Sequence, residues 1–140
     1  MGTWSYQPFG NDTALDWVAE LIESKNLSVI QETLDNAIDG GADYLDAEIA
    51  EESLAAIEVL AKLKGKATQI DAYTEEVDLW VSENFTKIKI TAALSKKALE
   101  VLKLIQSENS ELMKMWKDAD NEDFSKWNNN LTELINALKI

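Results

Sequence analysis

Apolar residues recur at intervals of three and four along most of the chain, which is the spacing of one face of an α-helix. The final segment shows this best, because Phe124, Trp127, Leu131, Leu134 and Leu138 follow that spacing throughout. Nothing in the chain has the pattern of a β-hairpin. The pattern therefore predicts an all-α fold.

Residues that favour helix ends divide this pattern into about seven helices with short loops. The predicted helices begin at Asn11 or Asp12, Ser28, Asp43, Asp71, Thr86, Ser110 and Asp120. Ser28 and Gln31 have the spacing of a capping box, and we expect Gly40-Gly41 and Gly65 to end the second and third helices. A length of 140 residues is typical of one domain, so residues 1–140 are predicted to form a single-domain helical bundle.

The chain contains no Cys, no His and no Arg. This composition excludes disulfides, thiol nucleophiles, zinc fingers and imidazole base catalysis, and it leaves no guanidinium group to clamp a phosphate. The formal net charge of −13 also disfavours binding to nucleic acid. We therefore expect a protein that is not an enzyme, holds no cofactor and binds no nucleic acid.

The sequence contains neither a membrane-spanning segment nor a secretion signal, and both features bear on where the protein is located in the cell. No apolar stretch approaches the roughly 20 residues of a membrane span. The first nine residues lack the basic and apolar regions of a secretion signal. The sequence thus predicts a cytoplasmic protein with no membrane partner, and we expect it to be a monomer when free.

The negative charge is concentrated in the first half of the sequence. Residues 1–61 hold 13 acidic residues and one Lys, a net charge of −12, whereas residues 62–140 hold 13 acidic residues and 12 Lys, a net charge of −1. Acidic residues form stripes along the first two predicted helices and crowd the third. These residues are Asp12, Asp16, Glu20, Glu23, Glu32, Asp35, Asp39, Asp43, Asp46, Glu48, Glu51, Glu52 and Glu58.

An acidic surface of this kind has two interpretations. A single-sign surface accelerates association with a partner of opposite charge. It also keeps a protein soluble without binding anything in particular. On the first interpretation, the residues predicted to contact a basic partner are Asp12, Asp16, Glu20, Asp35, Asp39, Asp43, Asp46, Glu48, Glu51 and Glu52.

Paired carboxylates also suggest a divalent metal ion as an alternative. Asp12 with Asp16, and Asp35 with Asp39, have a suitable spacing on one helix face. Di-metal carboxylate bundles normally include a Glu-x-x-His motif, which this chain lacks. The segment from Asp118 resembles the start of an EF-hand loop, but its sixth position is Asp123 where Gly is required. The sequence therefore predicts no metal site, and a carboxylate-based metal protein or enzyme stays an alternative.

Five Trp residues are many for this length. Four occupy apolar helical positions, where core packing explains them: Trp17, Trp80, Trp116 and Trp127. Trp4, Tyr6 and Phe9 precede the first predicted helix. We expect them to fold back over the bundle as a plug, with an exposed aromatic anchor for a partner as the alternative.

Several segments resemble one family. The carriers of the resemblance are Met1-Gly2-Thr3-Trp4, Phe9, Asn11-Asp12, Ala14 and Asp16-Trp17, together with Tyr44–Glu48, Glu108–Leu112, Trp116, Trp127 and Leu131. This pattern resembles a bacterial family of small all-α proteins classed as a domain of unknown function. Gly10, where many members carry an acid, departs from it. The resemblance implies a fold rather than an activity.

Small acidic helical proteins of this kind are similar to immunity proteins of bacterial toxin systems, which block a cognate toxin, often a basic nuclease. The sequence-based hypothesis is accordingly an immunity-type protein that neutralises a cognate toxin, such as a basic nuclease domain, through its acidic helices. A divalent-metal protein and a structural or regulatory module are the alternatives.

Overall fold

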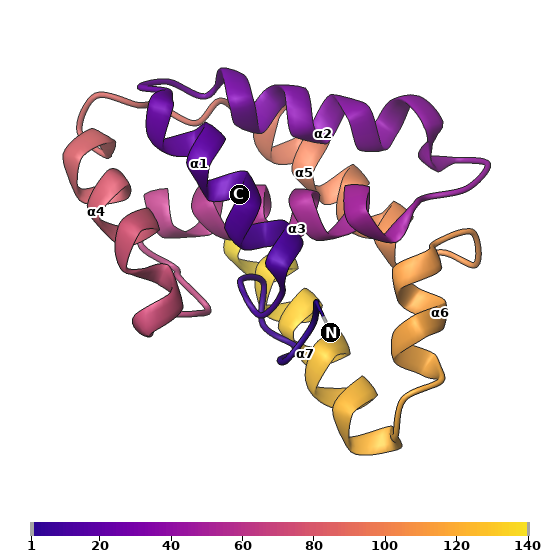
Figure 1. Ribbon diagram of the computed structural model, residues 1–140. Helices are drawn as coiled ribbons and strands as arrows, with labels where there is room; N and C mark the ends of the chain where they lie inside the picture. The colour runs from indigo at the N-terminus through magenta and orange to yellow at the C-terminus, as the bar shows by residue number, and fades with distance from the viewer. Residues whose placement is uncertain (1, 140) are drawn as a thin grey trace.

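The protein folds into one all-α body, as predicted, in the computed structural model, which describes residues 2–139 (Figure 1). Within these residues there are seven α-helices and one short 3₁₀ helix. Their bounds are α1 (Asp12–Glu23), α2 (Ser28–Gly41), α3 (Ala47–Leu63), η1 (Ala72–Thr74), α4 (Glu75–Asn84), α5 (Ala92–Ile105), α6 (Glu111–Lys117) and α7 (Asn121–Leu138).

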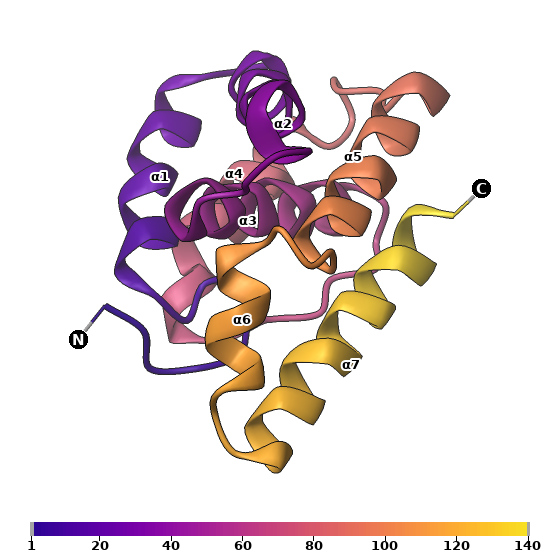
Figure 2. The same ribbon diagram turned by 90° about the vertical axis from the view of Figure 1, so that its right-hand side faces the viewer.

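Helix α3 is the centre of the molecule. It contacts each of the other six α-helices, and Figures 1 and 2 show them arranged around it. Twelve of its 17 residues are buried, and many of these are alanines, whose small side chains let neighbouring helices approach closely. A helix that is apolar on nearly every side is expected in the middle of a core.

Two tryptophan side chains join the helices around this centre through their polar ends. The indole N–H of Trp17 donates to Oγ1 of Thr33 over 2.9 Å and so links α1 to α2. The indole N–H of Trp80 donates to the carbonyl oxygen of Ser24 over 2.7 Å and so links α4 to the end of α1. Both rings are buried, which confirms the prediction that they pack in the core.

Several predicted helix starts are confirmed. Asn11, Ser110 and Asp120 are N-caps whose side chains accept hydrogen bonds from backbone N–H groups of the first turn. The predicted capping box of the second helix is wrong, because its N-cap is Leu27 and no side chain caps it. The backbone N–H of Ser28 donates instead to Oδ1 of Asn26 over 2.9 Å, so a local turn takes the place of a cap.

Two other helices begin later than predicted. Helix α3 is capped by Asp46 rather than Asp43, because Leu45 is first held by two backbone hydrogen bonds, to Asn109 and Glu111, each 2.9 Å long. The fifth predicted helix begins at Ala92 rather than Thr86, because Thr91 has an extended backbone and caps α5 by accepting from the backbone N–H of Leu94. Helix α2 also continues through Gly40-Gly41 instead of ending before them.

The N-terminal segment partly matches the predicted plug. Phe9 is fully buried and Tyr6 is half-buried, whereas Trp4 is 41% exposed and packs on Tyr73 with 5.3 Å between ring centroids. The segment turns sharply at Gly10, where a Cβ atom would stand 2.6 Å from Cβ of Ser5. A side chain at that position requires a shift of the turn.

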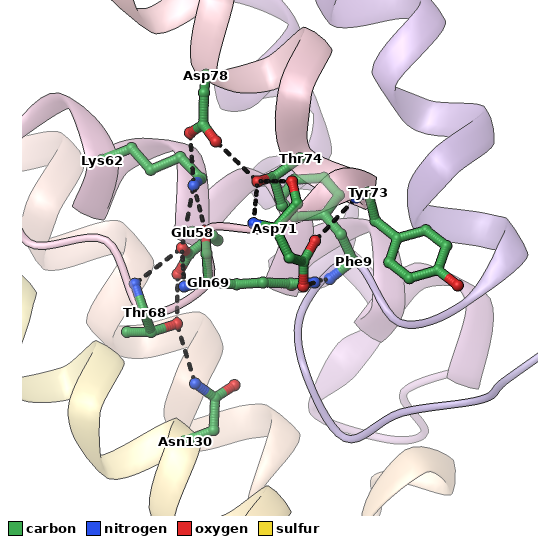
Figure 3. Close-up of polar contacts among 10 residues, drawn as sticks. All are labelled: Phe9, Glu58, Lys62, Thr68, Gln69, Asp71, Tyr73, Thr74, Asp78 and Asn130. Carbon is green, nitrogen blue, oxygen red and sulfur yellow. Dashed lines mark hydrogen bonds and ion pairs between the residues drawn. The ribbon is translucent and has the colours of Figure 1, made fainter.

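A buried carboxylate, Glu58, ties the long loop after α3 back onto that helix (Figure 3). The side chain of Glu58 is fully buried. Its Oε2 atom accepts from the backbone N–H groups of Thr68 and Gln69, each over 2.9 Å, and its Oε1 atom accepts from the Thr68 hydroxyl over 2.6 Å. The Lys62 ammonium lies 3.7 Å from Oε2. From α7, Nδ2 of Asn130 donates to the Thr68 hydroxyl oxygen over 3.0 Å. Glu58 is therefore a core residue and not part of the acidic surface of α3.

The same polar network continues into α4 and the N-terminal segment. The Lys62 ammonium donates to the carbonyl oxygen of Gln69 and to Oδ1 of Asp78, the latter over 2.7 Å. Thr74 donates to Oδ2 of Asp78 over 2.7 Å. The side-chain oxygen of Gln69 accepts from the backbone N–H of Phe9 over 2.8 Å. One connected set of hydrogen bonds thus holds five parts of the chain together: α3, the loop after it, η1 with α4, α7 and the N-terminal segment.

Removing the Glu58 carboxylate is expected to destabilise the fold strongly. In the Glu58→Ala variant, Lys62 loses one carboxylate partner and the N–H groups of Thr68 and Gln69 lose their acceptor inside the core. We expect the free energy of unfolding to fall by about 3–5 kcal/mol, measured by urea denaturation. Glu133→Ala, on the exposed face of α7, is the control and should change it by less than about 0.5 kcal/mol. A loss below about 1 kcal/mol in Glu58→Ala would contradict the central role of this network.

Candidate functional site

A groove of about 740 Å³ lies where the end of α1, the start of α2 and the first turns of α3 meet. Four carboxylates line it: Glu20 and Glu23 from α1, Glu32 from α2 and Glu52 from α3. The rest of the lining is mostly uncharged, and Lys25 is its basic residue. We call this feature the acidic groove.

The turn between α1 and α2 places these carboxylates together. Helix α1 ends at Ser24, whose backbone N–H donates to the carbonyl oxygen of Leu21 over 2.9 Å. The Ser24 hydroxyl then donates to the backbone of Asn26 over 3.1 Å, and Asn26 in turn holds the start of α2. A short, hydrogen-bonded turn therefore brings the last acidic residues of α1 beside the first acidic residue of α2.

The environment of Glu52 disfavours the charged form of its carboxyl group. Burial raises the pKa of its carboxyl group, and the negative charges of Glu20 and Glu48 raise it further. Within residues 2–139, no Lys forms an ion pair with any of the four groove carboxylates. The groove therefore keeps uncompensated negative charge that the fold itself does not use.

The structure distributes the ten predicted contact residues unevenly. Seven are exposed: Asp12, Asp16, Glu20, Asp39, Asp43, Asp46 and Glu48. Glu52 is half-buried beside the groove. Asp46 has a structural task as well, since its Oδ1 atom accepts from the backbone N–H of Glu48 over 2.8 Å at the start of α3.

Glu51 does not belong to this surface, so its assignment as a docking residue is corrected. It is only 8% exposed, and its Oε2 atom accepts from the Thr3 hydroxyl over 3.4 Å. Burial raises the pKa of the Glu51 carboxyl, against hydrogen bonds from Thr13 and Thr3 that lower it. Its position one residue before Glu52 turns it toward the N-terminal segment instead of toward solvent.

The acidic stripe of α2 is also divided. Glu32 lines the groove toward α1, whereas Asp35 forms an ion pair with Lys97 of α5, with 2.6 Å between Nζ and Oδ1. A cation from the second half of the chain thus neutralises Asp35, and we remove it from the docking set. Glu23 and Glu32 line the groove but were not among the ten predicted contacts. Both lie at three- or four-residue spacing in the acidic stripes of their helices, and that spacing could have identified them.

The metal alternative gains no geometric support. In the part of the chain that the structure describes, no group of three or more acidic residues is arranged to hold a metal ion. Across the same residues, no helix combines the length and the apolar character needed to cross a bilayer.

The buried carboxyl groups predict how stability depends on pH. The pKa values of Glu51, Glu52 and Glu58 are all raised by burial. The folded chain therefore binds protons more tightly than the unfolded chain, and its stability falls as pH rises from the unfolded pKa through the raised folded values. We expect a higher melting temperature at pH 5 than at pH 7.5, measured by circular dichroism.

The contribution of the groove to this effect is separable. Glu52→Gln should raise the melting temperature at pH 7.5 by about 1–2 °C and reduce the difference between the two pH values. Glu133→Gln removes the same formal charge from the exposed face of α7 and is the matched control. A melting temperature that increases from pH 5 to pH 7.5 in the unmodified protein would refute the sign of the effect.

Comparison with known proteins places the chain in a family without identifying an activity. No curated protein and no solved structure matches it. One family model matches residues 2–130. The resemblance to a family of unknown function is thereby confirmed, and the chain belongs to the family described as domain of unknown function DUF4259.

Proposed function

We propose that this protein is an immunity-type binding protein, whose acidic groove docks a basic toxin domain and neutralises it. The observation that carries the proposal is the meeting of four carboxylates from three helices around one groove, with Lys25 as the basic residue of the lining. Such a surface attracts a cationic protein over a distance of about one Debye length, roughly 8–10 Å at physiological salt.

The position of the groove suits recognition by a folded partner. Glu52 comes from α3, whose buried face anchors it to the core, whereas Glu20, Glu23 and Glu32 are exposed on α1 and α2, where a partner can reach them. The exposed acids Asp16 and Glu48, from α1 and α3, extend the negative surface beyond the groove.

A basic nuclease is the class of toxin that fits this charge best. Nucleases bind the phosphate backbone through Lys and Arg, and a protein that presents carboxylates in place of phosphates competes for the same cationic surface. This step rests on chemistry and on analogy with other acidic immunity proteins, not on a shared motif.

The test uses a basic nuclease toxin domain, taken from the neighbouring gene if that gene encodes one, and purified as a catalytically inactive variant. We expect its association rate with the unmodified protein, measured by stopped-flow fluorescence, to fall at least about tenfold between 50 and 500 mM salt. The triple variant Glu20→Gln, Glu32→Gln, Glu52→Gln should associate about tenfold more slowly at 50 mM salt, because it removes the groove charge.

A matched variant separates the groove from net charge. Glu100→Gln, Glu108→Gln, Glu133→Gln removes three exposed carboxylates outside the groove and should change the rate less than twofold. If both triple variants slow association equally, the groove is not the docking site. If the rate does not depend on salt, acidic docking itself is wrong, and the structural or regulatory alternative is favoured.

A further inference from the structure

A second groove, of about 500 Å³, is cationic although the chain carries a net charge of −13. Its charged lining residues are Lys64, Lys89 and Lys139, with no acidic residue among them. Within residues 2–139, none of these three lysines forms an ion pair. The groove therefore presents positive charge that no carboxylate of the described chain neutralises. We call it the lysine groove.

One wall of the lysine groove is formed by residues 88–90, in the non-helical segment that joins α4 to α5. Its side chains alternate: Ile88 and Ile90 are half-buried, whereas Lys89 is exposed. Thr91 ends the segment with φ −80° and ψ 158°, which is extended backbone. This alternation is that of a strand with one apolar and one charged side.

The backbone of this segment has no strand partner. Among residues 2–139, the N–H and C=O groups of Lys89 and Ile90 take part in no backbone hydrogen bond. The two isolated strand-like bridges of the described chain lie elsewhere, at Thr3 with Asn11 and at Leu45 with Ser110. On either side of them, the N–H of Ile88 donates to the carbonyl oxygen of Asn84 over 3.0 Å, and the carbonyl oxygen of Thr91 accepts from the N–H of Ser95 over 3.1 Å. Free backbone donors and acceptors are groups with which another extended chain can pair.

We propose that the lysine groove binds an extended acidic segment of a partner protein, which lies along residues 88–90 and hydrogen-bonds to the free backbone groups of Lys89 or Ile90 on the edge that it approaches. Apolar side chains of that segment contact Leu63, Ile88 and Ile90 in the groove, and its carboxylates face Lys64, Lys89 and Lys139. Alternating acidic and β-branched residues supply both sets of contacts at the two-residue period of a strand.

This site is independent of the acidic groove. The lysine groove is built from the end of α3, the start of α5 and the end of α7, whereas the acidic groove lies on α1, α2 and the start of α3. Figure 2 shows α1 and the C-terminal end of α7 on opposite sides of the molecule. The two sites have opposite charge and take partners of opposite charge.

The direct test titrates the full-length protein with the peptide acetyl-Glu-Val-Glu-Val-Glu-Val-amide, followed by the backbone amide resonances of Lys89 and Ile90. We expect saturable shifts of these resonances and slower hydrogen exchange at one of the two amides, because the N–H groups of adjacent residues in a strand point to opposite edges. The block peptide acetyl-Val-Val-Val-Glu-Glu-Glu-amide has the same composition and should bind at least about tenfold more weakly, because it lacks the alternation.

Two N-methylated peptides test the backbone pairing without changing the protein. In a strand, the N–H groups of alternate residues lie on one edge, so methylating the three Val nitrogens blocks one edge and methylating the three Glu nitrogens blocks the other. Strand addition predicts that only one of the two peptides loses binding. Equal binding of both, or equal loss in both, would overturn the proposal.

Charge variants test the role of the lysines. Lys89→Glu with Lys139→Glu should weaken binding of the alternating peptide about tenfold, whereas Lys103→Glu with Lys114→Glu, on exposed faces of α5 and α6, should change it less than twofold. Melting temperatures within about 2 °C of each other show that both pairs fold. Equal weakening by both pairs, no binding at millimolar peptide, or binding only to phosphatidylglycerol vesicles would each overturn the proposal.

Discussion

The fold depends on how one buried carboxylate, Glu58, obtains its hydrogen bonds. A carboxylate in the centre of a helical core costs several kcal/mol unless donors surround it. Here those donors are Thr68 and Gln69, which lie in the loop that follows α3 and must return over that helix to reach it. The path of the loop is thus set by the electrostatic requirement of Glu58, and with it the starting points of η1 and α4.

The burial of helix α3 also determines where the two candidate surfaces lie. Helix α3 is nearly all buried from Ala50 to Lys62, so its exposed polar residues are confined to its two ends. Near the start of the helix Glu52 lines the acidic groove, and at its end Leu63 and Lys64 line the lysine groove. One rigid element therefore supports both surfaces and keeps their charges apart.

Local signals in the sequence were sufficient for most of the fold. Asn11, Ser110 and Asp120 act through hydrogen bonds within one helical turn, so a short window reveals them. Asp43 has the same local signal as Asp46, yet only Asp46 caps α3, because Leu45 pairs with residues of the distant segment around Ser110. The helix predicted from Thr86 is present as α5 but begins at Ala92, because Ile90 continues the helical spacing of Leu94 and Ala98 and the apolar pattern alone does not mark the start.

The site was harder to predict because burial does not follow from spacing alone. Glu51, Glu52 and Glu58 occupy one helix, and the sequence pattern places all three among the acidic residues of that helix. Their surroundings differ: Glu51 contacts the N-terminal segment, Glu52 lines the acidic groove, and Glu58 accepts hydrogen bonds from the loop after α3. Each outcome is decided by a segment far away in the chain. Asp35 is a similar case, because its partner Lys97 lies 62 residues later.

Opposite charges at two ends of a small protein have a consequence for binding order. The net charge of −13 attracts cationic proteins from any direction. Because the negative charge is concentrated near α1 and α2, the protein rotates so that the acidic groove faces an approaching cationic protein. An acidic segment is repelled by the molecule as a whole and gains attraction only close to Lys64, Lys89 and Lys139. A cationic protein that first covers the acidic groove lowers this repulsion. Binding at the acidic groove should therefore favour binding at the lysine groove, through charge alone and without a change of shape.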